Sequence, residues 1–131
     1  MEVSKLTEIS NLVLGAVEQA SDIVMEIYNS DDLKVEDKHD GSPVTIADKR
    51  CHEILLNSLK SIDANIPILS EEGDTEENKE DLFWLIDPLD GTKEFINKNG
   101  EFTVNVALIE DGKPILGVVS APAVQETFIG F

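Results

Sequence analysis

Two aspartates, Asp87 and Asp90, follow an apolar run and are the residues of this chain best placed to do chemistry. The run over residues 82–86 is short and unbroken, which predicts a strand buried on both faces with Asp87 at its carboxyl end. Pro88 fixes its own φ and keeps Asp87 out of helical geometry, so we expect a turn that brings Asp90 round toward Asp87. Two carboxylates that face one small volume suit a divalent cation.

The residues after Asp90 predict a place for an anion beside these carboxylates. Gly91 has no side chain and would let a ligand approach the backbone, and residues 92–97 are predicted to begin a helix whose free N–H groups suit a phosphate. This combination indicates metal-assisted phosphoryl chemistry. The same residues are also a good turn sequence in which Asp90 only caps the helix, and both interpretations stay open.

A second set of acids follows another short apolar run at residues 66–69, where the chain reads Ser70, Glu71, Glu72, Gly73. Ligands of open α/β sheets gather outside the carboxyl ends of strands, so Glu71 and Asp87 could meet there. Adjacent glutamates in a loop are also often simply solvated.

Thr45 and Asp48 have the spacing of a capping box, in which each side chain bonds an end N–H group of a helix. Asp48 would also place negative charge at the positive end of the helix dipole. The helix is predicted to run to about residue 61 because apolar residues recur at helical spacing. Its predicted buried stripe is Ala47, Cys51, Ile54, Leu55 and Leu59.

The rest of the chain predicts one helix and several strands. Residues 4–29 are expected to form an amphipathic helix whose buried stripe includes Leu12, and residues 33–38 a strand that leads into a mobile loop. His39 in that loop and His52 on the second helix are expected to be solvated and to have no catalytic role. Residues 74–81 read as an acidic surface loop. Residues 102–109 and 115–120 predict a β-hairpin around Asp111 and Gly112, and residues 126–131 begin another strand.

Composition narrows the class of protein. A chain of 131 residues that is 41% hydrophobic can form one packed domain. The net charge of −17 argues against a nucleic-acid surface, and it indicates that an acidic protein binding a phosphorylated molecule needs divalent cations. The single cysteine, Cys51, cannot form an internal disulfide, and no leader or membrane-spanning run is present, so we expect a cytoplasmic protein whose membrane association, if any, is peripheral at the inner membrane.

Several segments resemble a known family. The sequence Asp-Pro-Leu-Asp-Gly-Thr at 87–92, with Ser-Glu-Glu-Gly at 70–73 upstream, is similar to the signature of the inositol monophosphatase superfamily of magnesium-dependent, lithium-sensitive phosphatases. The strings at 93–96 and 99–109 resemble the CysQ-type 3′(2′),5′-bisphosphate nucleotidases more than the inositol phosphatases. The resemblance spans nearly the whole chain.

This resemblance implies roles for individual residues. Glu71, Asp87, the Leu89 carbonyl and Asp90 would hold magnesium, and Asp48 acting through Thr92 would orient the attacking water. Residues Glu71, Leu89, Asp90, Gly91 and Thr92 would contact the substrate, with the amides of Gly91 and Thr92 on the transferred phosphate. No cluster of Cys or His suggests zinc instead.

The resemblance also implies an α+β fold, the first half of a layered αβαβα sandwich in which two N-terminal helices pack on a mainly antiparallel sheet. Residues 1–131 would then be the metal-binding half of a phosphatase domain, truncated within a strand and lacking the family's C-terminal metal-binding aspartate. The implied substrate is adenosine 3′,5′-bisphosphate, converted to AMP and phosphate. An inositol phosphatase or sugar bisphosphatase, a non-catalytic metal-binding fragment, and a homo-oligomer all remain open alternatives.

Overall fold

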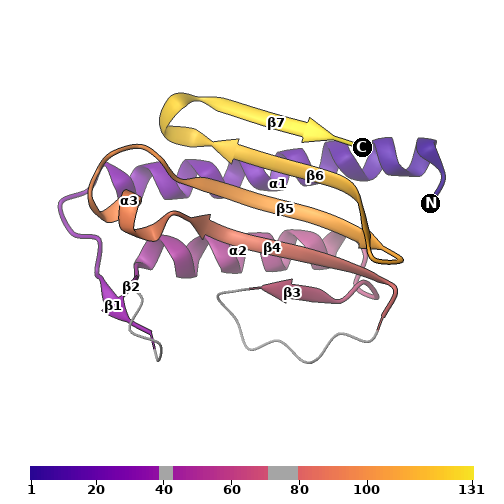
Figure 1. The fold of residues 1–131 in the computed structure, drawn as a ribbon, viewed down its shortest axis with the longest axis horizontal. Coiled ribbons are helices and arrows are strands. Elements are labelled where there is room, and N and C mark those ends of the chain that lie inside the picture. The colour runs from indigo at the N-terminus through magenta and orange to yellow at the C-terminus, as the bar shows by residue number, and fades with distance from the viewer. Residues whose placement is uncertain (39–42, 71–79) are drawn as a thin grey trace.

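The computed structural model describes residues 1–38, 43–70 and 80–131, which fold into two layers (Figure 1). A five-stranded sheet forms one layer, and helices α1 (Val3–Tyr28) and α2 (Ile46–Ile62) cover one of its faces. The predicted arrangement of two N-terminal helices on a mainly antiparallel sheet is therefore confirmed. The other elements are β1 (Glu36–Asp37), β2 (Pro43–Val44), β3 (Ile68–Ser70), β4 (Leu82–Asp90), α3 (Thr92–Ile96), β5 (Thr103–Glu110), β6 (Lys113–Ala121), the 3₁₀ turn η1 (Pro122–Val124) and β7 (Glu126–Gly130).

The sheet has the strand order β3-β4-β5-β6-β7. Strands β3 and β4 pair in parallel, and every other neighbouring pair is antiparallel. The predicted hairpin is β5 and β6, and Asp111 and Gly112 at its turn have positive φ angles of 51° and 78°. Two positive φ angles give the turn a twist that matches the strands it joins.

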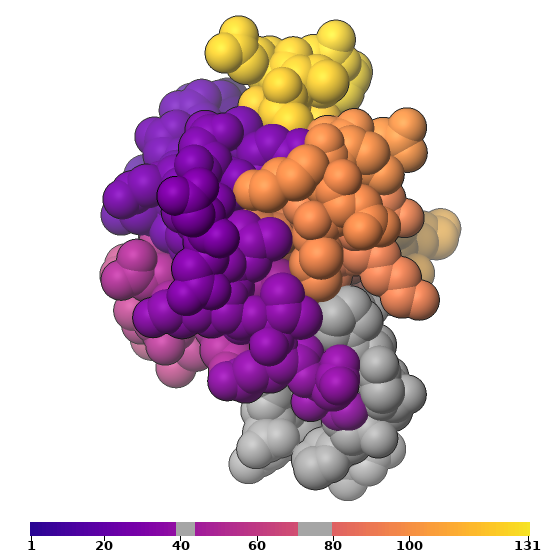
Figure 2. Space-filling model, turned by 90° about the vertical axis from the view of Figure 1, so that its left-hand side faces the viewer, coloured from indigo at the N-terminus to yellow at the C-terminus, as the bar shows by residue number. Residues whose placement is uncertain are grey.

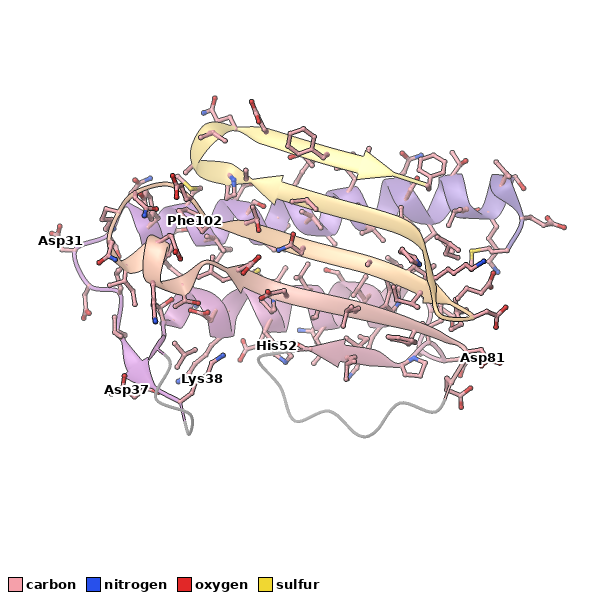
Figure 3. The ribbon with its side chains drawn as sticks, in the orientation of Figure 1. Asp31, Asp37, Lys38, His52, Asp81 and Phe102 are labelled. Carbon is pink, nitrogen blue, oxygen red and sulfur yellow. The ribbon has the colours of Figure 1, made fainter. Side chains whose placement is uncertain are left out.

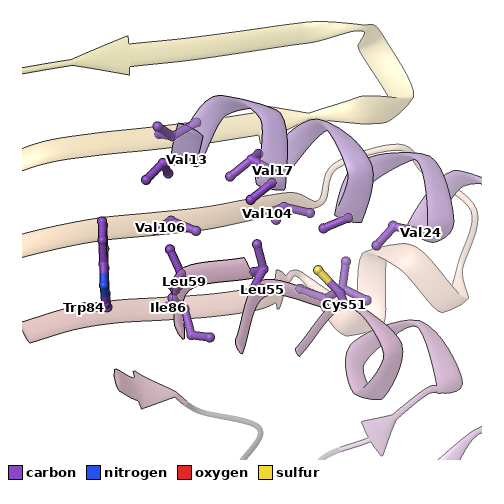
Figure 4. Packing of buried hydrophobic residues seen from close by; sticks show 14 of the residues in the cluster. Val13, Val17, Val24, Cys51, Leu55, Leu59, Trp84, Ile86, Val104 and Val106 are labelled. Carbon is purple, nitrogen blue, oxygen red and sulfur yellow. The ribbon is translucent and has the colours of Figure 1, made fainter. Parts of the chain in front are cut away.

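Both long helices bury one apolar stripe, as their periodicity predicts. Figure 4 shows this core, where Val13 and Val17 of α1 and Leu55 of α2 meet Ile86 and Val106 of the sheet. Each such side chain stabilises the fold by roughly 1.5–3 kcal/mol when fully buried. Leu12 does not belong to the stripe, because its side chain is 52% exposed on the outer side of α1.

The prediction that β4 is buried on both faces is wrong. Trp84 and Ile86 point into the core, but Leu85 between them is 41% exposed. The two helices cover only one face of the sheet, and Val119 and Phe128 are also exposed. The strand therefore alternates between a buried and an open side.

The predicted strand at 33–38 is reduced to two residues, β1, which pair with β2. Both β1 residues are exposed and polar, so they bury no surface that would extend the strand. Lys49 donates a 2.7 Å hydrogen bond to Glu36, which lowers the pKa of that carboxyl. The expected mobile loop with His39 and the acidic stretch at 74–79 lie outside the described residues.

No helix in the described ranges combines the length and the apolar character needed to cross a membrane.

Candidate active site

A bulge in β4 sets the direction of the two candidate carboxylates. Asp87 pairs with Asn105 of β5 and Asp90 pairs with Thr103, so Pro88 and Leu89 together oppose a single residue. Asn105 and Thr103 are two residues apart and share one face of the sheet, and side chains directly across a ladder point to the same side. Asp87 and Asp90 therefore share the open face, although a separation of three would place them on opposite faces of a regular strand.

Asp90 thus lies on the same side as Asp87, as expected, but a bulge within the strand places it there rather than a turn after the strand. The sequence predicted that the strand would end at Asp87 and turn, whereas β4 continues to Asp90. Pro88 has no N–H to donate to a ladder, which explains why the irregularity begins there. Pro88 and Leu89 are both buried in consecutive positions, so the bulge moves the apolar pattern by one residue.

Gly91 is required by the backbone around it. Its φ of 92° lies in the left-handed region, and a Cβ there would meet the Glu101 carbonyl oxygen at 2.7 Å. The nearest atoms belong to the protein, so close backbone approach accounts for this glycine without a ligand.

The predicted helix after Gly91 is α3, a single short turn that begins at Thr92. It is held by an aromatic cluster in which the rings of Phe95, Phe102 and Tyr28 lie 4.9–5.3 Å apart, centroid to centroid. Figure 3 places Phe102 beside α3, and Figure 2 views the molecule from this end. Lys98 adds a cation–π contact over Tyr28 and a hydrogen bond to its carbonyl. These contacts hold α3, the helix that begins at Thr92.

The side chains of Thr92 and Asp48 meet. The Thr92 hydroxyl donates to Asp48 Oδ1 at 2.9 Å, and the Leu89 carbonyl is a more distant second acceptor at 3.4 Å. The other carboxylate oxygen of Asp48 accepts from the Thr45 backbone N–H and the Thr45 hydroxyl, both at 2.7 Å. Asp48 is fully buried and caps α2, so the predicted capping box is confirmed. The same carboxylate thus serves both the helix start and Thr92.

The end of β3 lies beside β4. The parallel register pairs Ser70 with Ile86, the residues that precede Glu71 and Asp87 in the sequence. Glu71 and Glu72 lie outside the described residues, so the predicted metal ligand Glu71 has no described position. Within residues 1–38, 43–70 and 80–131, no three His, Cys, Asp or Glu side chains form a group that could hold a metal ion.

Four residues make contacts around Asp87, Asp90 and the strand ends that the sequence did not predict. Thr103 and Asn105 lie across from Asp90 and Asp87, and their side chains are hydrogen bonded at 2.9 Å. The alternation along β5 was the signal that could have found them. Cys51 donates from its thiol to the Pro88 carbonyl at 3.0 Å, and His52 Nδ1 lies 2.9 Å from the Ser70 hydroxyl. His52 is half-buried, so the prediction that it is solvated is wrong.

The electrostatics of the site are acidic. Burial raises the pKa of the Cys51 thiol, and the charges of Asp48 and Asp87 raise it further, so Cys51 remains a neutral donor. The carboxylates of Asp87 and Asp90 and the carbonyl of Leu89 are oxygen donors of the kind magnesium prefers. These three oxygen donors are thus chemically suited to that ion.

Comparison with known proteins identifies the fold and the family. The model of the inositol monophosphatase family matches residues 5–131. The 3′(2′),5′-bisphosphate nucleotidase CysQ of Escherichia coli O157:H7 is 50% identical over 110 residues, which cover 81% of this chain and 45% of that protein. The corresponding protein of Aggregatibacter actinomycetemcomitans is 40% identical over 120 residues, covering 88% of this chain and 44% of the relative. The chain spans about half the length of the curated relatives it matches.

Solved structures agree with this assignment. The extragenic suppressor protein suhB of Bartonella henselae superposes with a TM-score of 0.86 at 27% identity, covering 94% of this chain and 48% of that one. CysQ of Bacteroides thetaiotaomicron, described as a bacterial member of the inositol monophosphatase family, gives a TM-score of 0.79 at 37% identity and covers 94% and 45%. By its sequence and its α+β fold, this chain belongs to the inositol monophosphatase family.

Proposed function

We propose that this chain is the water-activating and metal-binding part of a magnesium-dependent phosphomonoester hydrolase. The observation that carries the proposal is the hydrogen bond from Thr92 to the buried carboxylate of Asp48. A hydroxyl that donates its only proton to a carboxylate keeps its lone pairs for another donor. Such a donor would be the water that attacks phosphorus.

Asp48 is suited to act through Thr92. Its Oδ2 is held by two hydrogen bonds from Thr45, so its Oδ1 faces Thr92 in a fixed direction. As water loses a proton to Thr92, the Thr92 proton can pass to Asp48, which makes Asp48 the general base. The start of α2 is rigid, and the hydrogen bonds from Thr45 keep the Asp48 side chain in one orientation.

We assign the metal ligands to Asp87, the Leu89 carbonyl, Asp90 and, from the family resemblance, Glu71. When bound there, magnesium would polarise the phosphoryl oxygens and favour ionisation of the attacking water. The shared open face of Asp87 and Asp90 supports this assignment. A net charge of −17 also means that the chain itself supplies little positive charge to a phosphate.

We assign substrate contacts to Glu71, Leu89, Asp90, Gly91 and Thr92. Phe95 donates its N–H to the Gly91 carbonyl, so the helix begins at Thr92 and its first amides have no acceptor within the helix. Those amides would hold the transferred phosphate.

The proposed substrate is adenosine 3′,5′-bisphosphate, released as AMP and phosphate, in the cytoplasm. Relatives that are 50% identical are named 3′(2′),5′-bisphosphate nucleotidases, whereas a similar fold is found in the Thermotoga maritima inositol monophosphatase at 29% identity. The higher identity favours the nucleotide over an inositol phosphate. A non-nucleotide phosphomonoester is the second candidate, and it rests on that structural likeness.

The test is magnesium-dependent phosphate release by the purified chain, with adenosine 3′,5′-bisphosphate and inositol 1-phosphate compared at equal concentration. Asp90→Asn removes a proposed ligand and should abolish release. Asp111→Asn is the matched control, because it makes the same change at an exposed turn at the other end of the sheet. Release that persists in Asp90→Asn, or that needs no magnesium, would refute the proposal.

A further inference from the structure

One face of α2 touches each of the three segments that carry the proposed site. Cys51 and His52 follow Asp48 by three and four residues, so both lie near Asp48 on the same side of the helix. Asp48 reaches Thr92 at the start of α3, Cys51 reaches Pro88 in the β4 bulge, and His52 reaches Ser70 at the end of β3. We propose that Cys51 and His52 are positioning residues that hold the β4 bulge and the end of β3 in register with Asp48. This inference rests on the function proposed above.

The contact of Cys51 stabilises the bulge where it departs from the ladder. The register omits Pro88 and Leu89, so the Pro88 carbonyl lies where the regular cross-strand pairing is interrupted. A buried carbonyl without a partner is costly, and the Cys51 thiol at 3.0 Å supplies one. The next carbonyl along the chain is that of Leu89, a proposed metal ligand. Fixing one peptide plane restricts the orientation of the next.

The contact of His52 acts on the neighbouring strand. Ser70 is the last residue of β3, and its hydroxyl lies 2.9 Å from His52 Nδ1. Figure 3 shows His52 close to this end of β3. β3 has only three residues, and among the strands that the structure describes it pairs with β4 alone. The bond from α2 therefore fixes a strand end that pairing alone would hold weakly.

A helix can set the distances between the segments that form such a site. Its residues keep fixed mutual distances, whereas three loops would each have to be ordered separately. Cys51 is fully buried, and its hydrogen bond to Pro88 ties this turn of α2 to the β4 bulge. Outer groups that orient metal ligands typically contribute 10–100-fold to metal affinity.

The test uses the full chain and two pairs of variants. Cys51→Ala and His52→Ala remove the donor groups, whereas Cys51→Ser and His52→Asn keep a hydrogen-bonding atom near the same place. Asn57→Ala is the matched control, because Asn57 is exposed on the same helix. Two quantities are measured: Mg²⁺ affinity by calorimetry, and amide hydrogen exchange in the segments 66–70 and 86–91, with β6 as the internal reference.

We expect each alanine variant to weaken Mg²⁺ binding by about tenfold and to speed exchange in its own segment by a similar factor. Exchange in β6 should not change, and the conservative variants and Asn57→Ala should behave like the native chain. A general loss of stability would instead speed exchange everywhere and would not be restored by Ser or Asn.

Two results would overturn the inference. One is native Mg²⁺ affinity in both alanine variants. The other is unchanged amide hydrogen exchange in both segments of the alanine variants. This result would show that Cys51 and His52 do not position the segments, even if the native chain binds no Mg²⁺. Failure of the proposed function looks different: Mg²⁺ binding would be absent, or equal in the native chain and Asp87→Asn, while the exchange of segments 66–70 and 86–91 still reports on positioning.

Discussion

The hydroxyl of Thr92 lies 2.9 Å from Oδ1 of Asp48, although the two residues are 44 positions apart in the chain. The contact joins the start of α2 to the start of α3. Because Asp48 is also the third helical residue of the capping box that begins at Thr45, hydrogen bonds at the start of α2 hold its side chain in place. The proposed catalytic pair thus comes from two helix starts.

Replacement of Thr92 by valine should lower kcat for the proposed nucleotide hydrolysis by about 100-fold, because general-base assistance is typically worth that much. Valine keeps the shape and loses the hydroxyl. Thr92→Ser keeps the hydroxyl and should remain within about tenfold of the native rate. The check is steady-state kinetics at saturating Mg²⁺, and a native rate in Thr92→Val would show that Asp48 does not act through this residue.

Replacement of Gly91 by alanine should destabilise the fold by about 2 kcal/mol or more. The new Cβ would lie 2.7 Å from the Glu101 carbonyl oxygen, and the left-handed φ adds strain of its own. Gly112→Ala is the control, because its φ of 78° is similar but nothing lies within 4 Å of the added Cβ. Urea unfolding of the two variants separates the clash from the strain, and equal losses would contradict the account.

Stability should fall as the pH rises above about 8.5, the ordinary pKa of an unfolded cysteine. Burial, Asp48 and Asp87 raise the pKa of Cys51 in the folded chain, so the unfolded chain loses this proton first. The unfolded state then binds fewer protons than the folded state, and the free energy of unfolding declines by up to about 1.4 kcal/mol per pH unit. The contribution of Cys51 to the free energy of unfolding is complete below pH 8.5, and it is lost as the pH rises toward the pKa of Cys51 in the folded chain.

Urea unfolding between pH 7.5 and 10 measures this slope, with Cys51→Ser as the comparison. The serine variant has no group that titrates in this range at that position and should show a smaller decline. The same slope in both proteins would mean that other groups cause it.

Removal of one partner of the buried pair formed by Ser21 and Ser120 should cost about 1–3 kcal/mol, because the remaining hydroxyl is left without a partner. Their oxygens lie 2.9 Å apart and join α1 to β6. Ser21→Ala with Ser120→Ala should cost less than the sum of the single changes. A double-mutant cycle by thermal or urea unfolding tests this, and strict additivity would show that the bond contributes nothing.

Local rules accounted for most of the elements. The 3.6-residue period of α1 and α2, the capping box at Thr45, and the turn at Asp111 and Gly112 depend on neighbours within a few residues. The same rules failed where pairing across the sheet decided the outcome. Pro88 was expected to end the strand, but pairing of Asp90 with Thr103 carries β4 past it.

The sequence by itself determined three local features: the acids around Pro88, the glycine at the turn, and the capping box formed by Thr45 and Asp48. It determined these because residue type and local spacing are properties of the chain. Only the tertiary structure decided that the β4 bulge puts Asp87 and Asp90 on one face and that Cys51 and His52 contact the strands. Those contacts depend on how α2 lies across the sheet, and burial of its apolar stripe, rather than any local signal near the partners, sets that geometry.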